Sequence, residues 1–83
     1  MGRQEKLIAR FKKIPADFSW DELCRMMKGF GFETIGGSGS RYKFVHPESK
    51  QVLSLHQPHP GNIVKRYALR QVRECLKEGG LIK

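Results

Sequence analysis

Long apolar runs are missing from this sequence. No segment is long and apolar enough to cross a bilayer, and the first residues lack the apolar core of a secretory signal. We therefore expect a soluble, cytoplasmic protein with no membrane partner. Cysteine is also scarce: Cys24 and Cys75 are too few for a disulfide framework, and we expect two reduced core thiols. With 83 residues there is room for one small domain, expected to span residues 1–83.

Acidic residues are few as well. Asp+Glu number 8 against 16 Lys+Arg, which gives a formal net charge of +8 at pH 7. On so small a domain, this excess favours an anionic partner. Charge alone does not choose between nucleic acid and an acidic protein. A chain of this size buries only about 60% of the surface that it exposes when unfolded, so a partner protein can also contribute to its stability.

Apolar spacing predicts two helices in the first third of the chain. Residues 4–14 carry four apolar side chains at helical spacing among several cations, and Pro15 ends that helix. The next helix begins after Ser19, which forms a capping box with Glu22 three residues later. One face of this helix is apolar, formed by Trp20, Leu23, Cys24 and Met27, and the glycines of residues 29–31 end the helix.

Alternating apolar residues predict three strands, over residues 32–35, 41–45 and 52–55. Short turns join them, so they form an antiparallel meander, and residues 56–61 are expected to be irregular. A last helix is predicted over 63–77. The expected fold class is therefore a compact α+β fold of order α-β-β-β-α, with a three-stranded antiparallel sheet and an extra N-terminal helix.

Two segments carry the groups that a protein needs to hold a phosphodiester backbone. Residues 39–47 read Gly-Ser-Arg-Tyr-Lys-Phe-Val-His-Pro, and residues 56–60 read His-Gln-Pro-His-Pro. Basic residues with an interleaved aromatic are typical of nucleic-acid binding, and a neutral imidazole is the side chain best suited to proton transfer near pH 7. We therefore expect any chemistry of this chain to lie in these segments.

The three histidines are the candidates for that chemistry. His56 and His59 lie three residues apart, and His46 is placed to approach them across the sheet. Zinc needs three or four ligands at ordered spacing, so we expect no metal. Acid–base catalysis of RNA cleavage fits the imidazoles better. The alternative for each histidine is an exposed turn residue, but the prolines on both sides of His59 restrict its segment and favour it.

A stripe of cations runs along the last predicted helix, formed by Arg66, Arg70, Arg73 and Lys77. At 100° per residue it lies opposite an apolar face formed by Ala68, Val72, Cys75 and Leu76. No carboxylate interrupts the stripe. It is either a solvated surface or a surface that neutralises several phosphates, and the second would make binding strongly salt-dependent.

These residues together resemble the HicA toxins. The resemblance rests on the element order, the Gly-Ser-x-aromatic-Lys-Phe-x-His-Pro strand of residues 39–47 and the closing Gly-Gly-Leu-Ile, and it spans Trp20 to Ile82. It implies a double-stranded-RNA-binding-domain-like core over residues 19–82, with helix 4–14 as an extension. It further implies the toxin of a type II toxin–antitoxin pair, an mRNA interferase that needs no cofactor and is neutralised by a HicB antitoxin.

The sequence departs from the family at one position. The usual catalytic histidine follows Gly-Ser, and here Arg41 follows Ser40. Arginine stays protonated and is no base, although it stabilises a phosphorane. Either His59, or less strongly His56, supplies the proton chemistry beside Arg41, or the domain binds RNA without cleaving it.

We take the first interpretation, a metal-independent endoribonuclease acting on mRNA. Its expected site consists of His59 as the acid–base residue with His56 as the substitute, Arg41 and Lys43 on the scissile phosphate, Ser40 assisting, and Arg66, Arg70 and Arg73 positioning the RNA. A noncatalytic RNA-binding module is the alternative. A third class, an interaction domain for an acidic protein, predicts negligible RNA affinity at physiological salt.

Overall fold

The computed structural model describes residues 2–59 and 61–82. Pro60, which was expected to bracket His59 together with Pro58, lies outside the described residues, as do the two ends of the chain. The elements are α1 (Arg3–Lys12), α2 (Trp20–Gly29), β1 (Glu33–Gly36), β2 (Arg41–Val45), β3 (Val52–His56) and α3 (Arg66–Glu78). The strands form one antiparallel sheet in the order β1-β2-β3. The predicted α+β fold, with its helix in front, is confirmed.

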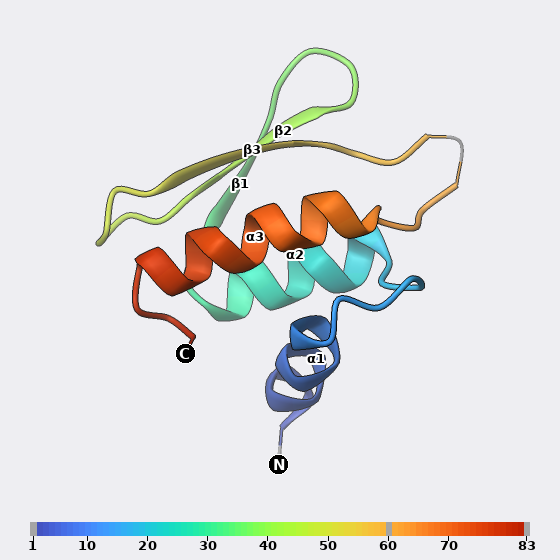
Figure 1. Ribbon diagram of the computed structural model, residues 1–83. Helices are drawn as coiled ribbons and strands as arrows, with labels where there is room; N and C mark the ends of the chain where they lie inside the picture. Colours follow the sequence, from blue (N-terminus) through green and yellow to red (C-terminus); the bar gives the residue numbers. More distant parts are fainter. Residues whose placement is uncertain (1, 60, 83) are drawn as a thin grey trace.

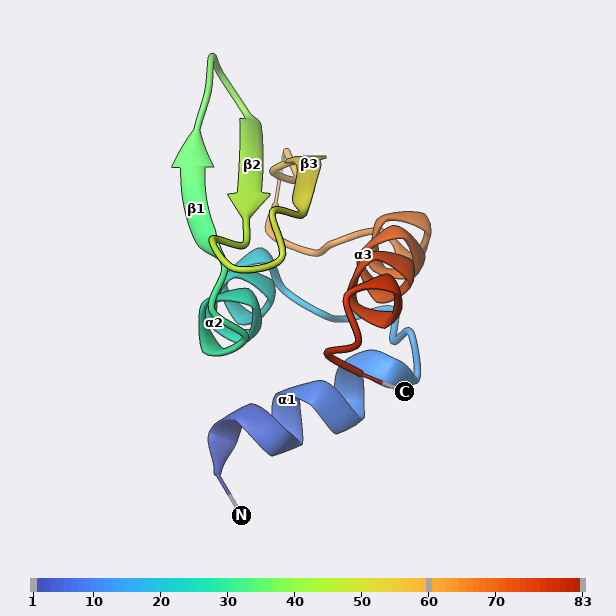
Figure 2. The ribbon, with the colours of Figure 1, turned by 90° about the vertical axis from the view of Figure 1, so that its left-hand side faces the viewer.

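The elements stack in three layers (Figures 1 and 2). The sheet forms the first layer, and α2 and α3 pack beneath it, with α2 against β1 and α3 against β3. Helix α1 lies below the two helices, on the side away from the sheet, and packs on α2. No described helix covers the other face of the sheet, which we call the open face.

Helix α2 is buried on two sides because it lies between the sheet and α1. Trp20 packs on Phe44 of the sheet, with ring centroids 5.8 Å apart. Met26 is also fully buried, and its carbonyl accepts a hydrogen bond from the Gln4 side chain of α1 at 2.9 Å. The predicted apolar face is confirmed for Trp20 and its neighbours along the helix, although Cys24 is only half-buried.

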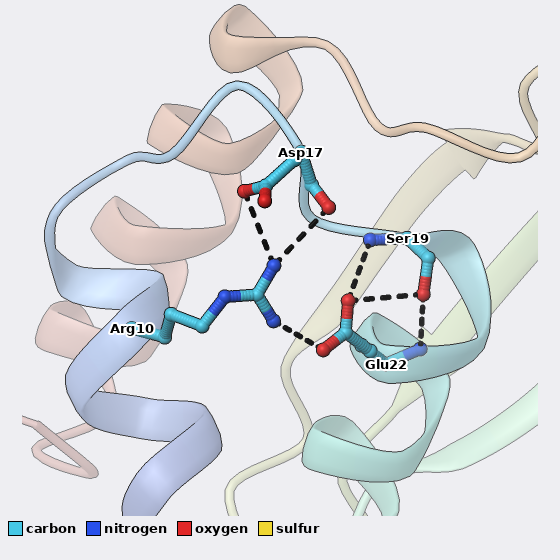
Figure 3. Close-up of polar contacts among 4 residues, drawn as sticks. All are labelled: Arg10, Asp17, Ser19 and Glu22. Carbon is cyan, nitrogen blue, oxygen red and sulfur yellow. Dashed lines mark hydrogen bonds and ion pairs between the residues drawn. The ribbon is translucent and has the colours of Figure 1, made fainter.

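The start of α2 is capped as predicted. The Ser19 hydroxyl accepts from the Glu22 amide at 3.1 Å, and the Glu22 carboxylate accepts from the Ser19 amide at 3.0 Å. Arg10 of α1 donates to the same carboxylate and, at 3.1 Å, to Asp17 (Figure 3). The amide of Ser19 and the Arg10 guanidinium hold the pKa of Glu22 below its usual value. This network fastens α1 to the start of α2.

The bounds of α1 and α3 differ from the predicted ones. Helix α1 runs from Arg3 to Lys12 instead of over residues 4–14, and Ile14 has a φ of 50°, outside the right-handed helical region. Helix α3 begins at Arg66, three residues later than predicted. Residues 62–64 instead run antiparallel to residues 18–20. The Asn62 carbonyl accepts from the Trp20 amide at 2.7 Å, and the Val64 amide donates to the Phe18 carbonyl at 2.8 Å. Because this pairing already bonds the Asn62 carbonyl and the Val64 amide, α3 does not extend back to residue 63.

Candidate functional site

Strand β3 runs one residue further than predicted and includes His56. In the β2–β3 ladder, Arg41 is the direct partner of His56, and Lys43 is the partner of Ser54. Direct partners in an antiparallel ladder share a face, with their Cβ atoms about 4.5–5.5 Å apart. Arg41 and His56 therefore lie side by side on adjacent strands of the sheet.

The alternation of buried and exposed residues along β2 and β3 shows which face of the sheet Arg41 and His56 share. Phe44 is fully buried against the helices, and Leu53 and Leu55 are 7% and 6% exposed. Arg41 and His56 occupy the alternate positions and are exposed, so they lie on the open face.

A half-open groove of about 610 Å³ lies at this pair. Arg41, Lys43, Ser54 and His56 line it from the strands, and Ser38 lines it from the hairpin between β1 and β2. No carboxylate is among the lining residues, so the groove, which we call the sheet groove, suits an anion. Sequence reasoning missed Ser54, although its place two residues before His56 on the same strand is the signal that finds it.

Ser40 lies at the end of this groove and does not line it. It is half-buried, and its carbonyl accepts a hydrogen bond from the Gln57 amide at 2.8 Å. On the other side of the hairpin, the Gly37 amide donates to the Arg41 carbonyl at 2.8 Å. These two bonds hold the hairpin and the segment after β3 around the Arg41–His56 pair.

His59 follows three residues after β3 and is exposed. It does not line the sheet groove, and within residues 2–59 and 61–82 no hydrogen bond to its side chain is found. The structure thus pairs His56 with Arg41 in the strand ladder, and His56 lines the sheet groove whereas His59 does not.

His46 has a different role from the one expected. It lies just beyond β2, at the end opposite Arg41, so the expected approach to His56 is wrong. Its side chain is 8% exposed, with Nε2 3.0 Å from the Phe30 carbonyl and Nδ1 3.2 Å from the Ser49 amide. Because that amide donates to Nδ1, we assign the hydrogen to Nε2, which donates to the carbonyl. Through these two bonds, His46 joins the turn at Phe30 to the turn at Ser49.

The cations of α3 lie behind the sheet and do not line the sheet groove. Arg66 and Arg70 are exposed, but Arg73 is half-buried, and its Nε is a buried donor with no partner among the described residues. The fully buried residues of α3 are Leu69, Val72 and Leu76. The stripe therefore borders the buried face instead of lying opposite it, and Ala68 and Cys75 of the predicted face are only half-buried.

Other chemistries find little support in the described part of the chain. No group of three or more His, Cys, Asp or Glu side chains there is arranged to hold a metal ion. Cys24 and Cys75 are half-buried free thiols, and burial raises the pKa of both, which disfavours the nucleophilic thiolate. No helix within residues 2–59 and 61–82 has the length and apolar character needed to span a membrane.

The chain was also compared with known proteins. A family model described as HicA toxin of bacterial toxin-antitoxin matches residues 20–81, which run from the start of α2 to just beyond α3. Neither the curated proteins nor the solved structures gave a significant match. The matched region contains the whole sheet groove and leaves α1 outside. The chain therefore belongs to the HicA toxin family of bacterial toxin–antitoxin systems, which implies an antitoxin as its partner.

Proposed function

We propose that this chain is a metal-independent endoribonuclease that cleaves mRNA, the toxin of a type II pair, and that a HicB-like antitoxin neutralises it. The observation that carries the proposal is the Arg41–His56 pair, in register on the open face of the sheet and within a groove free of carboxylates. An imidazole and a permanent cation at one place supply two of the roles in phosphodiester cleavage, proton transfer and charge stabilisation.

The cleavage step assigns a role to each of these groups. His56 takes the proton of the ribose 2′-hydroxyl, and the 2′-oxygen attacks the neighbouring phosphorus. Arg41 and Lys43 stabilise the charge of the phosphorane. The 5′-oxygen then leaves with a proton, for which His59 is the candidate donor, from the segment that follows β3.

The geometry favours His56 over His59 as the base. His56 is held by the strand ladder opposite Arg41, whereas His59 lies three residues beyond the strand. A general base must lie within hydrogen-bond reach of the proton that it removes. The backbone of His56 is fixed by the strand ladder, which favours such a defined position. Ser40, at the end of the groove, is suited to a phosphate contact that assists these residues.

The arginines of α3 are assigned to binding phosphates of the RNA other than the scissile one. Arg66 and Arg70 are exposed, and Arg73 keeps its guanidinium on the border of the buried face. Because α3 lies on the other side of the sheet, we assign them to phosphates further along the RNA strand from the scissile one. Each such contact adds to the salt dependence of binding without adding sequence preference.

One observation favours a second function, a noncatalytic RNA-binding module. Arg41 occupies the position after Gly-Ser where the resemblance implies a catalytic histidine. If His56 does not replace that residue, the same cationic groove holds RNA and leaves it intact.

Cleavage of labelled single-stranded RNA in EDTA separates these functions. The parent chain is compared with Arg41→Ala/His56→Ala and with Lys12→Ala, which removes an exposed cation of α1 far from the sheet groove. Products from the parent and from Lys12→Ala, but not from the double variant, support the proposal. Intact RNA with a mobility shift favours the binding module. Intact RNA without a mobility shift at physiological salt rejects both the ribonuclease and the RNA-binding module. That outcome favours a protein-interaction domain.

A further inference from the structure

Helix α1 carries an uneven share of the positive charge. Residues 3–13 contain five cations and one acid, Glu5, a net charge of +4 out of the +8 of the whole chain. Four of the cations, Arg3, Lys6, Arg10 and Lys13, recur every three or four residues and so line one flank of the helix, about 4.5–6 Å apart along its axis.

That flank meets α2 in a second groove of about 260 Å³, which we call the helix groove. It is lined by Arg3, Lys6, Leu7, Arg10, Glu22 and Arg25. Its single carboxylate is already bonded by Arg10 and by the cap of α2. The other three cations form no ion pair in the described part of the chain. The helix groove therefore presents three uncompensated positive charges.

We infer that the helix groove binds the phosphate backbone of RNA, outside the segment that lies in the sheet groove. The inference rests on the proposed function. Helix α1 lies on the side of α2 and α3 away from the sheet (Figure 2), so the two grooves are separate. Only a strand longer than the sheet groove reaches both of them. Because α1 lies outside the residues matched by the family, this surface is an addition to the family core.

The lining of the helix groove fits nucleic acid better than protein. Cores of protein–protein interfaces are depleted of charge and contain large apolar anchors. Here Leu7 is the one apolar residue among those that line the groove. The exposed large hydrophobic residues, Ile35, Val52, Ile63 and Tyr67, lie elsewhere. Interfaces with nucleic acid are polar and strongly positive, as this groove is.

Binding measurements with two lengths of RNA test the inference. The groove variant is Lys6→Gln/Arg25→Gln, and its matched control is Lys12→Gln/Lys50→Asn, which removes the same charge at exposed positions outside the groove. The probes are fluorescent 2′-O-methyl oligouridines of about 30 and about six nucleotides, the shorter near the lower limit of a single-strand site. Fluorescence anisotropy at several salt concentrations gives the Kd of each protein for each probe.

The groove variant is expected to bind the long probe roughly ten-fold more weakly than the control does. Its slope of log Kd against log salt falls by about 1.4, the value for two lost phosphate contacts. The short probe binds both variants alike, because it occupies the sheet groove alone. Equal affinity of variant and control for the long probe overturns the inference, and so does an equal loss for both probes.

Parallel assays distinguish failure of the groove from failure of the proposed function. Parent protein that cleaves unmodified RNA while the groove variant binds like the control rejects the helix groove alone. Parent protein that neither cleaves nor binds RNA rejects both proposals. A groove variant that binds RNA normally but loses affinity for its antitoxin also overturns the inference, since the groove then belongs to the protein partner.

Discussion

Arg41 and His56 face each other across the β2–β3 ladder, on the side of the sheet that no described helix covers. The two side chains differ in the one property that matters for proton transfer. The guanidinium keeps its proton throughout the physiological range, whereas an imidazole gains and loses one near neutrality. The pair thus divides cleavage into charge stabilisation by one residue and proton transfer by the other.

Replacement of Arg41 tests its proposed role in stabilising the charge of the phosphorane. Arg41→Ala should lower the cleavage rate by about 10²- to 10³-fold, the loss found when one group that stabilises a developing oxyanion is removed. Arg41→Lys keeps the charge but not the planar fork, and should retain part of the rate. Single-turnover rates with saturating enzyme measure both. An unchanged rate in Arg41→Ala contradicts the assigned role.

His46 is predicted to stabilise the fold and to take no part in cleavage. His46→Ala leaves the Phe30 carbonyl and the Ser49 amide without their partner and removes the edge-to-face contact with Phe32. We expect a loss of about 3 kcal/mol in the free energy of unfolding. Urea denaturation measures it, with the exposed His59→Ala as the control, which should change stability by less than about 0.5 kcal/mol. Equal stabilities of the two variants would refute the structural role.

The free energy of unfolding should depend on pH through the carboxyl group of Glu22. Its pKa is lowered in the folded chain, chiefly by the Ser19 amide and also by Arg10, so its contribution is complete above the ordinary value of 4.5. The contribution is lost as pH falls below that value and through the lowered pKa of the folded state. Glu22→Gln keeps an oxygen that can accept from the Ser19 amide but removes the charge that faces Arg10, and should cost about 0.5 kcal/mol at neutral pH.

Thermal unfolding at a series of pH values checks this prediction. The difference in stability between the parent and Glu22→Gln should shrink as pH falls below 4.5. A difference that stays constant down to the lowest pH shows that the carboxylate charge contributes nothing.

Features with short sequence separation could be predicted from the sequence. The capping box of Ser19 and Glu22 was predicted because its two members lie three residues apart. The strand 41–45 was predicted with its correct limits because its alternation is local. Arg41 and Lys43, both predicted for the site, do line one groove.

Features that depend on packing between distant segments could not be predicted. His56 joins the ladder because of its pairing with Arg41, which no local pattern encodes. His46 is buried because a carbonyl 16 residues earlier accepts its hydrogen. Met26 is buried because α1 adds a third layer, whereas the helical pattern of α2 alone indicated a single apolar face.

The central claim is that His56 is the base of a metal-independent ribonuclease. The most direct measurement is the rate of RNA cleavage in EDTA by the parent, His56→Ala and His59→Ala, each shown to be folded by circular dichroism. The account predicts that His56→Ala is slower by about 10²- to 10⁴-fold, the usual contribution of a general base, and that His59→Ala is slowed less. A His56→Ala variant that cleaves RNA as fast as the parent would contradict it.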